Sequence, residues 1–146
     1  MAKYARNDNE LIQGVKKFYL KQITEKIGED VKYLIKAYME EVFYGMYNPI
    51  YYNRTFQLLN SVTTTKVRET ANGYEIEVYL DINGIDYELE DTEYIVWLSS
   101  KGFHGSSNIY TTGEFWNDAM TELKGGYLQR KFGEYLKEKG LKVSLR

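Results

Sequence analysis

A helical pattern at the start of the chain is too long to fit along a compact domain of this size. From Leu11 to Phe43 apolar residues recur at spacings of three and four, which is typical of an amphipathic helix. Asn7 and Glu10 stand before it at the spacing of a capping box. A helix of about 36 residues is roughly 54 Å long, whereas a compact domain of this length has a diameter of roughly 38 Å. The apolar stripe stays in phase across Gly28, so we expect a continuous or gently bent helix with one projecting end, which needs a partner.

The middle of the chain has the pattern of a β-hairpin. Residues 62–70 are rich in Thr and Val, which favour strands, and Asn72-Gly73 is a strong signal for a tight turn. In residues 74–82 apolar and polar side chains alternate, as in a strand with one buried face. We therefore expect a hairpin whose Glu75 and Glu77 face solvent.

Further segments complete the predicted fold. Asn83-Gly84 signals a second hairpin turn, and residues 94–99 are apolar enough to form a last central strand buried on both faces. Helical spacing returns from Phe115 to Leu136, interrupted by Gly125-Gly126, which should kink or split the helix. The sequence therefore predicts one α+β domain over residues 1–146. It has a long N-terminal helix, a three- to four-stranded antiparallel β-meander and a C-terminal helix packed on one face of the sheet.

Two segments are expected to lack regular structure. Residues 1–8 are polar and predict a flexible N-terminus, and residues 99–113 are polar with three glycines, which predicts a long mobile loop. That loop nevertheless carries side chains that a monomer would expose. Together with two tyrosines from the irregular aromatic stretch before the hairpin, they are our candidate interface residues: Phe103, His104, Ile109, Tyr110, Tyr47 and Tyr51.

The chain is rich in aromatic residues, with 15 Tyr, 6 Phe and 2 Trp. Tyrosine suits surfaces that are wet in one state and buried in another, so it is enriched at protein interfaces. The alternative is that these rings fill the core. The sequence leaves both interpretations open, although there are more rings than one small core readily hides.

Composition argues against several classes of protein. The net charge of −2 and a pI near 5.5 argue against a dedicated nucleic-acid-binding protein, which usually carries a basic face. With no cysteine, the chain forms no disulfide and no thiolate metal site. It shows no apolar run of transmembrane length and no signal peptide, so we expect synthesis in the cytoplasm.

The residues that catalysis or metal binding would use form no recognisable site. His104 is the only histidine, and it lies in the glycine-rich loop without a nucleophile signature nearby. A dense group of carboxylates lacks the spacing and the glycine of a calcium-binding loop; its members are Asp81, Asp86, Glu88, Glu90, Asp91 and Glu93. We therefore predict no catalytic residue, metal or cofactor. The alternative is a small enzyme or toxin, a hydrolase or nuclease, that uses this acidic cluster or His104.

Between the first helix and the hairpin lies the motif Tyr-x-Arg-Thr-x-x-Leu-x-x-Ser. Arg54 has a fork of donors that can hold backbone carbonyls or a carboxylate, and Thr55 can satisfy loose backbone groups. Leu58 can anchor the turn in the core. The motif, carried by Arg54, Thr55, Leu58 and Ser61, therefore predicts a structural corner between helix and sheet and not an active site.

This motif resembles a segment of the small tail-completion proteins, the head–tail joining or neck proteins of long-tailed bacteriophages and prophages. In that family a segment of the type Arg-Thr-Gly-x-Leu-x-x-Ser leads into the first strand, and here Phe56 stands where the pattern has glycine. A Tyr-rich strand that ends at a glycine loop and a Phe that opens the last helix come later. Their counterparts here are residues 94–98, Gly102, and Phe115 with Ala119-Met120, so the order of elements covers nearly the whole chain.

The resemblance implies a structural virion protein that assembles into a homo-oligomeric ring at the neck, between the head connector and the tail tube. Its partners would be its own copies and other neck or tail proteins, with no membrane and no sequence-specific nucleic acid. It would reside in the host bacterial cytoplasm during assembly and then in the virion. A stand-alone interaction module of a prophage-like element is a further alternative.

Overall fold

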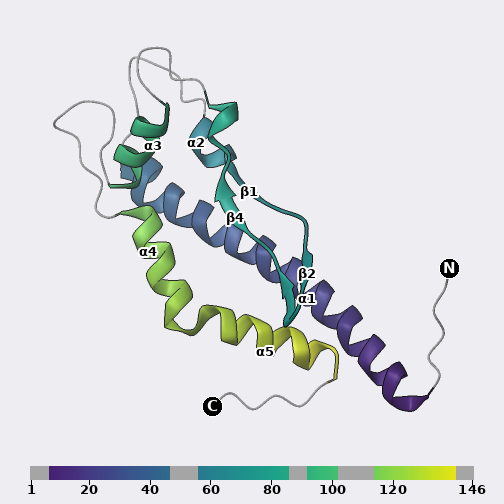
Figure 1. Cartoon of the computed structure of the whole chain (residues 1–146). Coiled ribbons are helices and arrows are strands. Elements are labelled where there is room, and N and C mark those ends of the chain that lie inside the picture. Colours follow the sequence, from purple (N-terminus) through teal and green to yellow (C-terminus); the bar gives the residue numbers. More distant parts are fainter. Residues whose placement is uncertain (1–6, 47–55, 86–91, 102–113, 141–146) are drawn as a thin grey trace.

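The computed structural model describes residues 7–46, 56–85, 92–101 and 114–140. They form an α+β fold built on one long helix, α1 (Asp8–Tyr38), which contacts both a β-ribbon and two C-terminal helices (Figure 1). The predicted fold class is therefore confirmed.

The helix α1 is continuous over 31 residues and runs on into a π-helical turn, η1 (Met39–Phe43), and a 3-10 turn, η2 (Tyr44–Met46). The Asn7 side chain accepts a hydrogen bond from the Glu10 backbone N–H at 3.0 Å, which confirms the predicted cap. In Figure 1 the N-terminal turns of α1 extend past the ribbon and past the last helix. Among the α1 side chains that the structure describes, Ile23 is the first buried one. The helix is thus continuous with a projecting end, as the periodicity predicted.

Gly28 is the point at which the ribbon comes closest to α1. It is buried, and a Cβ atom built on it would lie 2.4 Å from Cδ1 of Ile76. The glycine therefore serves close packing between helix and ribbon, and α1 continues through it without a break.

The predicted hairpin is present as a ribbon of four short antiparallel strands. β1 (Val62–Thr64) pairs with β4 (Val78–Leu80), and β2 (Arg68–Thr70) pairs with β3 (Gly73–Glu75). Between these pairs, residues 65–67 on one side face only residues 76–77 on the other, so the ribbon contains a β-bulge. The bulge divides the ribbon into two small sheets.

The predicted alternation along residues 74–82 is confirmed, because Glu75 and Glu77 are exposed while the alternating apolar residues Ile76, Val78 and Leu80 are half-buried. The turn, however, lies one residue earlier than predicted. Thr70 pairs with Gly73, which leaves Ala71-Asn72 at the centre of the turn. Gly73 has a φ of 152°, a region that favours glycine, and it opens β3 instead of lying within the turn.

Residues 94–99 were expected as a central strand, and this prediction is wrong: they belong to a helix, α3 (Thr92–Ser100). Val96 and Ser99 are both buried while Trp97 is 53% exposed, which is a helical and not a two-residue period. A short apolar run has no alternation that would separate a buried strand from a helix.

The second hairpin turn expected at Asn83-Gly84 is also wrong. These residues lie in a 3-10 turn, η3 (Ile82–Gly84), where Asp81 Oδ1 accepts a hydrogen bond from the Asn83 N–H at 3.2 Å. The Asp81 carboxylate thus stabilises a local turn that competes with a hairpin. Residues 86–91, the continuation of the expected meander, lie outside the described residues.

The C-terminal helix is split in two, as Gly125-Gly126 predicted. α4 (Phe115–Glu122) and α5 (Leu128–Glu138) flank a π-helical segment, η4 (Leu123–Tyr127), in which Gly126 has a φ of 105°. The left-handed backbone at this glycine breaks the helix, so the two halves follow different directions along α1 (Figure 1).

One hydrophobic core joins these elements around the C-terminal half of α1. The rings of Phe43 and Phe115 meet edge-on at its centre, with centroids 6.2 Å apart. A short helix that precedes β1, α2 (Gln57–Asn60), adds Leu58 to this core. The buried members are Val31, Ile35, Met39, Val42, Phe43, Leu58, Val62, Ile85, Val96, Phe115, Ala119 and Tyr127.

We expect Gly28→Ala to lower the free energy of unfolding by about 1–3 kcal/mol, because the added methyl group displaces Ile76 in a packed contact. The matched control is Gly14→Ala in the same helix, where a Cβ atom meets nothing within 4 Å. That control should raise the free energy of unfolding by about 0.5–1 kcal/mol through helix propensity. Urea denaturation of both variants tests the pair, and equal effects of the two substitutions would contradict the packing role of Gly28.

Candidate interaction surface

The corner motif is described in part, and that part is a tight backbone turn. Leu58 is 1% exposed, and the Ser61 hydroxyl donates a hydrogen bond to the Leu58 carbonyl oxygen at 2.6 Å. The Asp81 backbone N–H donates to the Ser61 carbonyl oxygen at 2.8 Å, which ties the corner to the ribbon. Leu58 and Ser61 are therefore brought together in the core, while Arg54 and Thr55 lie outside the described residues.

Phe56 has a backbone conformation that glycine adopts most readily. Its φ of 55° and ψ of 26° are left-handed, and among the described residues it is the one non-glycine residue with a positive φ. Its ring lies against that of Tyr44, with centroids 5.0 Å apart. Phe56 stands where the resembled motif has glycine, and its backbone has a left-handed conformation that glycine adopts readily.

The expected interface residues from the loop and the aromatic stretch all lie outside the described residues: Tyr47, Tyr51, Phe103, His104, Ile109 and Tyr110. The structure describes exposed apolar side chains on several elements, including Trp97 on α3 and Tyr79 on β4, and a pair on each of α1 and α5 stands three or four residues apart along its helix. The first part of the surface along α1 and α5 is the N-terminal segment of α1, residues 8–21, which we call the arm. The arm projects at its N-terminal end, whereas nearer the domain the ring of Tyr19 lies 5.3 Å from Lys139 Nζ.

The arm combines exposed apolar side chains with lysines. Val15 and Phe18, three residues apart on one side of the helix, are 43% and 60% exposed. Lys16, Lys17 and Lys21 are exposed too, and Lys17 forms an ion pair with Glu69 at the end of the ribbon, at 3.4 Å. Sequence periodicity predicted a projecting end but did not identify these residues. The signal was present, since the apolar stripe continues beyond the part of α1 that the domain covers.

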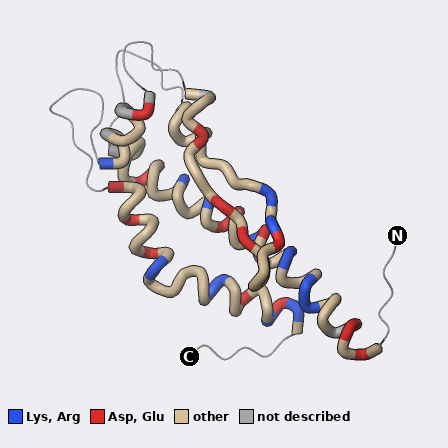
Figure 2. Tube along the Cα trace, in the orientation of Figure 1, with Lys and Arg blue, Asp and Glu red and all other residues tan. Residues whose placement is uncertain are grey.

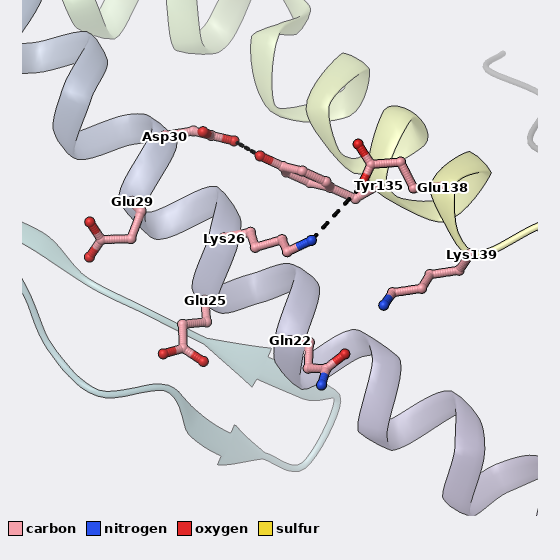
Figure 3. Close-up of a pocket in the computed structure, with 8 residues that line it drawn as sticks. All are labelled: Gln22, Glu25, Lys26, Glu29, Asp30, Tyr135, Glu138 and Lys139. Atoms are coloured by element: carbon pink, nitrogen blue, oxygen red, sulfur yellow. Dashed lines mark hydrogen bonds and ion pairs between the residues drawn. The ribbon is translucent and has the colours of Figure 1, made fainter.

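The second part is an open groove between α1 and α5 (Figure 3). In Figure 3 the ring of Tyr135 reaches from α5 toward α1, where its hydroxyl donates a hydrogen bond to Asp30 Oδ2. Lys26 Nζ lies 5.2 Å from the centre of that ring and 3.8 Å from Glu138 Oε2. Gln22, Glu25, Lys26, Glu29 and Asp30 of α1 line the groove, with Tyr135 and Glu138 of α5 and the adjoining Lys139.

The third part is an apolar strip that leads along α5 into this groove. Leu128 and Phe132 are 42% and 37% exposed, and they stand four residues apart. Tyr135 follows Phe132 by three residues, so all three lie on one side of the helix. Exposed apolar surface therefore continues from α5 to the wall of the groove.

Hydrogen bonds from tyrosines to acidic residues hold the C-terminal helices on α1. The bond to Asp30, followed by burial and the Asp30 charge, raises the pKa of the Tyr135 hydroxyl above its usual range. The Tyr38 hydroxyl donates to Glu122 Oε2 at 2.5 Å, and this bond, followed by burial, raises its pKa to about 12. Burial, with the nearby Asp30 charge, also raises the pKa of Tyr127. Some of the tyrosines thus link helices to one another.

The described residues hold no cluster of metal-ligating side chains and no membrane-spanning helix. Within them, no three or more His, Cys, Asp or Glu side chains gather in a way that could hold a metal ion. Of the acidic cluster, Asp81 caps η3 and Glu93 is exposed at the start of α3. No helix in the described ranges is long and apolar enough to cross a membrane.

The sequence model of the YomN family matches residues 7–138. The chain belongs to the YomN family. That family carries the name of a Bacillus phage and prophage gene, which supports a phage-derived protein. No curated protein and no solved structure matches the chain significantly.

The YomN match begins at the cap of α1 and ends at the last residue of α5. The arm, the corner motif, and both helices of the groove therefore lie within the YomN domain. The surface that the arm and groove form is part of that domain and not an appendage to it.

Substitutions at Phe56 separate backbone strain from ring packing. Phe56→Ala loses the contact with Tyr44 and keeps a left-handed non-glycine residue, whereas Phe56→Gly loses the same contact and relieves the strain. We expect the glycine variant to be more stable than the alanine variant by about 1–2 kcal/mol in urea denaturation. Equal stabilities would show that the left-handed conformation stores no strain.

The tyrosine–carboxylate bonds predict a loss of stability in alkali. A pKa raised from 10.0 to about 12 means that the Tyr38 bond stabilises the fold fully below pH 10 and ceases to do so as the pH rises toward 12. Tyr38→Phe should lower the free energy of unfolding at pH 8 by about 1–2 kcal/mol, and its stability should fall less between pH 10 and 12 than that of the wild type. Tyr33→Phe, at a 63% exposed position of the same helix, is the control. An unchanged alkaline profile in Tyr38→Phe would contradict this role.

Proposed function

We propose that the protein is a structural virion protein of a phage or prophage, a tail-completion or head–tail connector subunit that assembles into a ring at the neck. Membership of the YomN family supports a phage-derived protein. The motif at residues 54–61 and the order of a long helix, a ribbon and a final helix support the finer role, because they resemble those of tail-completion proteins. The Tyr-rich strand of that family gives no such support, since residues 94–98 lie in the helix α3.

The observation that carries the proposal is the arm. A helix of 31 residues extends beyond the domain and keeps Val15 and Phe18 exposed at its projecting end. Apolar side chains exposed to water do not stabilise a monomer, whereas a subunit of an assembly buries them against a neighbour. A ring subunit needs such a surface on every copy.

Phe56 supports the resemblance from an independent direction. The family pattern has glycine at this place, and the left-handed backbone of Phe56 is the conformation that glycine supplies. A left-handed backbone at this position is compatible with a family pattern that has glycine there, and this supports the resemblance.

The proposed role is non-catalytic and uses no metal or cofactor. Its partners are copies of the same chain and other neck or tail proteins, with no membrane and no sequence-specific nucleic acid. The subunit is made in the host bacterial cytoplasm and remains in the finished virion.

Inactivating the gene in the phage or prophage that carries it tests this function. We expect electron micrographs of lysates to show DNA-filled heads and free tails that do not join, and a plasmid copy to restore whole particles. Mass spectrometry of purified wild-type virions should detect the protein. Normal particles from the inactivated phage, or virions without the protein, would contradict the proposal.

A further inference from the structure

We propose that the arm of one copy docks on the α5 side of the next copy, so that the arm and the groove form the subunit contact of the assembly. Val15 and Phe18 would pack on the strip of Leu128, Phe132 and Tyr135, with arm lysines opposite groove carboxylates. This rests on the proposed function, and it identifies the surface and the partner that the ring uses.

The two surfaces match in apolar character. The arm presents two exposed apolar side chains one helical turn apart, and α5 presents two more at the same kind of spacing. Both strips lie on the sides of helices, so they can pack as helix against helix, with ridges of one in grooves of the other. Each pair is exposed in the single chain, and the contact would cover both at once.

The two surfaces also differ in charge. Four carboxylates and two ammonium groups line the groove: Glu25, Glu29, Asp30 and Glu138 against Lys26 and Lys139. The arm carries Asp8 and Glu10 at its tip and three lysines further in, as Figure 2 shows along α1. Lys32 pairs with Glu29 at 3.6 Å and reduces this negative excess. The lysines of the arm complement the net negative charge that remains, which favours association in one orientation.

The geometry of α1 decides which groove an arm can reach. The arm and the α1 wall of the groove belong to one continuous helix, so the arm points away from its own groove and cannot fold back into it. An arm that fills that groove therefore belongs to another copy. Such a contact joins two different surfaces, and repeated head-to-tail contacts of this type close into rings when the rotation allows.

Pairing between two arms is the competing arrangement, and charge disfavours it. Contact of two arms through Val15 and Phe18 would bring Lys16 and Lys17 of both copies close together. Like charges at such a contact oppose association. Docking in the groove places the same lysines beside carboxylates.

Cross-linking distinguishes these arrangements cleanly, because the chain contains no cysteine. Gly14→Cys places a thiol on the arm one turn from Phe18, at a position with no neighbouring atom within 4 Å. Gln129→Cys places a thiol at an exposed position beside Leu128 on α5. A short bismaleimide should link the two variants when they are mixed, leave each variant alone unlinked, and give a ladder with the double variant.

Linked dimers from Gly14→Cys alone would show arm–arm pairing and overturn the proposal. It is also overturned if no link forms at concentrations where the wild type is oligomeric, or if the wild type sediments as a monomer at every concentration. These outcomes do not test the proposed function. That function is tested separately, by the particles that the inactivated phage forms and by the presence of the protein in virions.

A substitution series supplies the energetic test. Phe18→Ser should weaken self-association in sedimentation equilibrium by about tenfold or more. Tyr79→Ser, at a 43% exposed site on the ribbon, is the control and should leave association unchanged. Thermal melts confirm that both variants fold. Equal association by Phe18→Ser and the wild type overturns the proposal, and if that variant still rescues the inactivated phage, the neck function stands without this interface.

Discussion

Every layer of this domain depends on the close packing of other elements against α1. The ribbon reaches the helix at Gly28, where the absence of a side chain makes room for Ile76. The C-terminal helices contact it through Phe115 and Ala119 in the core. Hydrogen bonds from the hydroxyls of Tyr38 and Tyr135 to carboxylates also join these helices to α1. A helix that anchors these two groups of elements along its length is held straight, and a straight helix longer than its domain leaves an end in solvent. The arm is thus a consequence of the core and not a separate device.

Local signals in the sequence predicted the features that local forces decide. The Asn7 cap, the alternation around Glu75 and Glu77, and the break at Gly126 each depend on a few neighbouring residues. The failures also have local causes. Residues 94–99 lack a period that separates strand from helix, and the Asp81 carboxylate turns the chain before Asn83-Gly84 can form a hairpin.

The interaction surface was predictable only in outline. Helix length implied a projecting end, but the groove joins residues 22–30 to residues 135–139, and no local pattern indicates that these segments meet. The same holds for the tyrosines. Composition left open whether the tyrosine rings fill the core or face partners. Tyr38 and Tyr135 have a third role, because the hydroxyl of each donates a hydrogen bond to a carboxylate on a neighbouring helix. Pairing across such distances is set by tertiary packing, which a single sequence does not display.

The break at Gly126 has a consequence for how the domain opens. α4 places Phe115 and Ala119 in the core, whereas the one residue of α5 that is buried is Gly133, which has no side chain to contribute. α5 is therefore held mainly by half-buried contacts and by the hydroxyl of Tyr135, beyond a glycine that uncouples it from α4. Helices held in this way open as separate cooperative units, at a free energy below that of global unfolding. Backbone amides of α5 should then exchange with solvent deuterium through a partial opening that leaves α1 and α4 protected, and an occupied groove would close that opening.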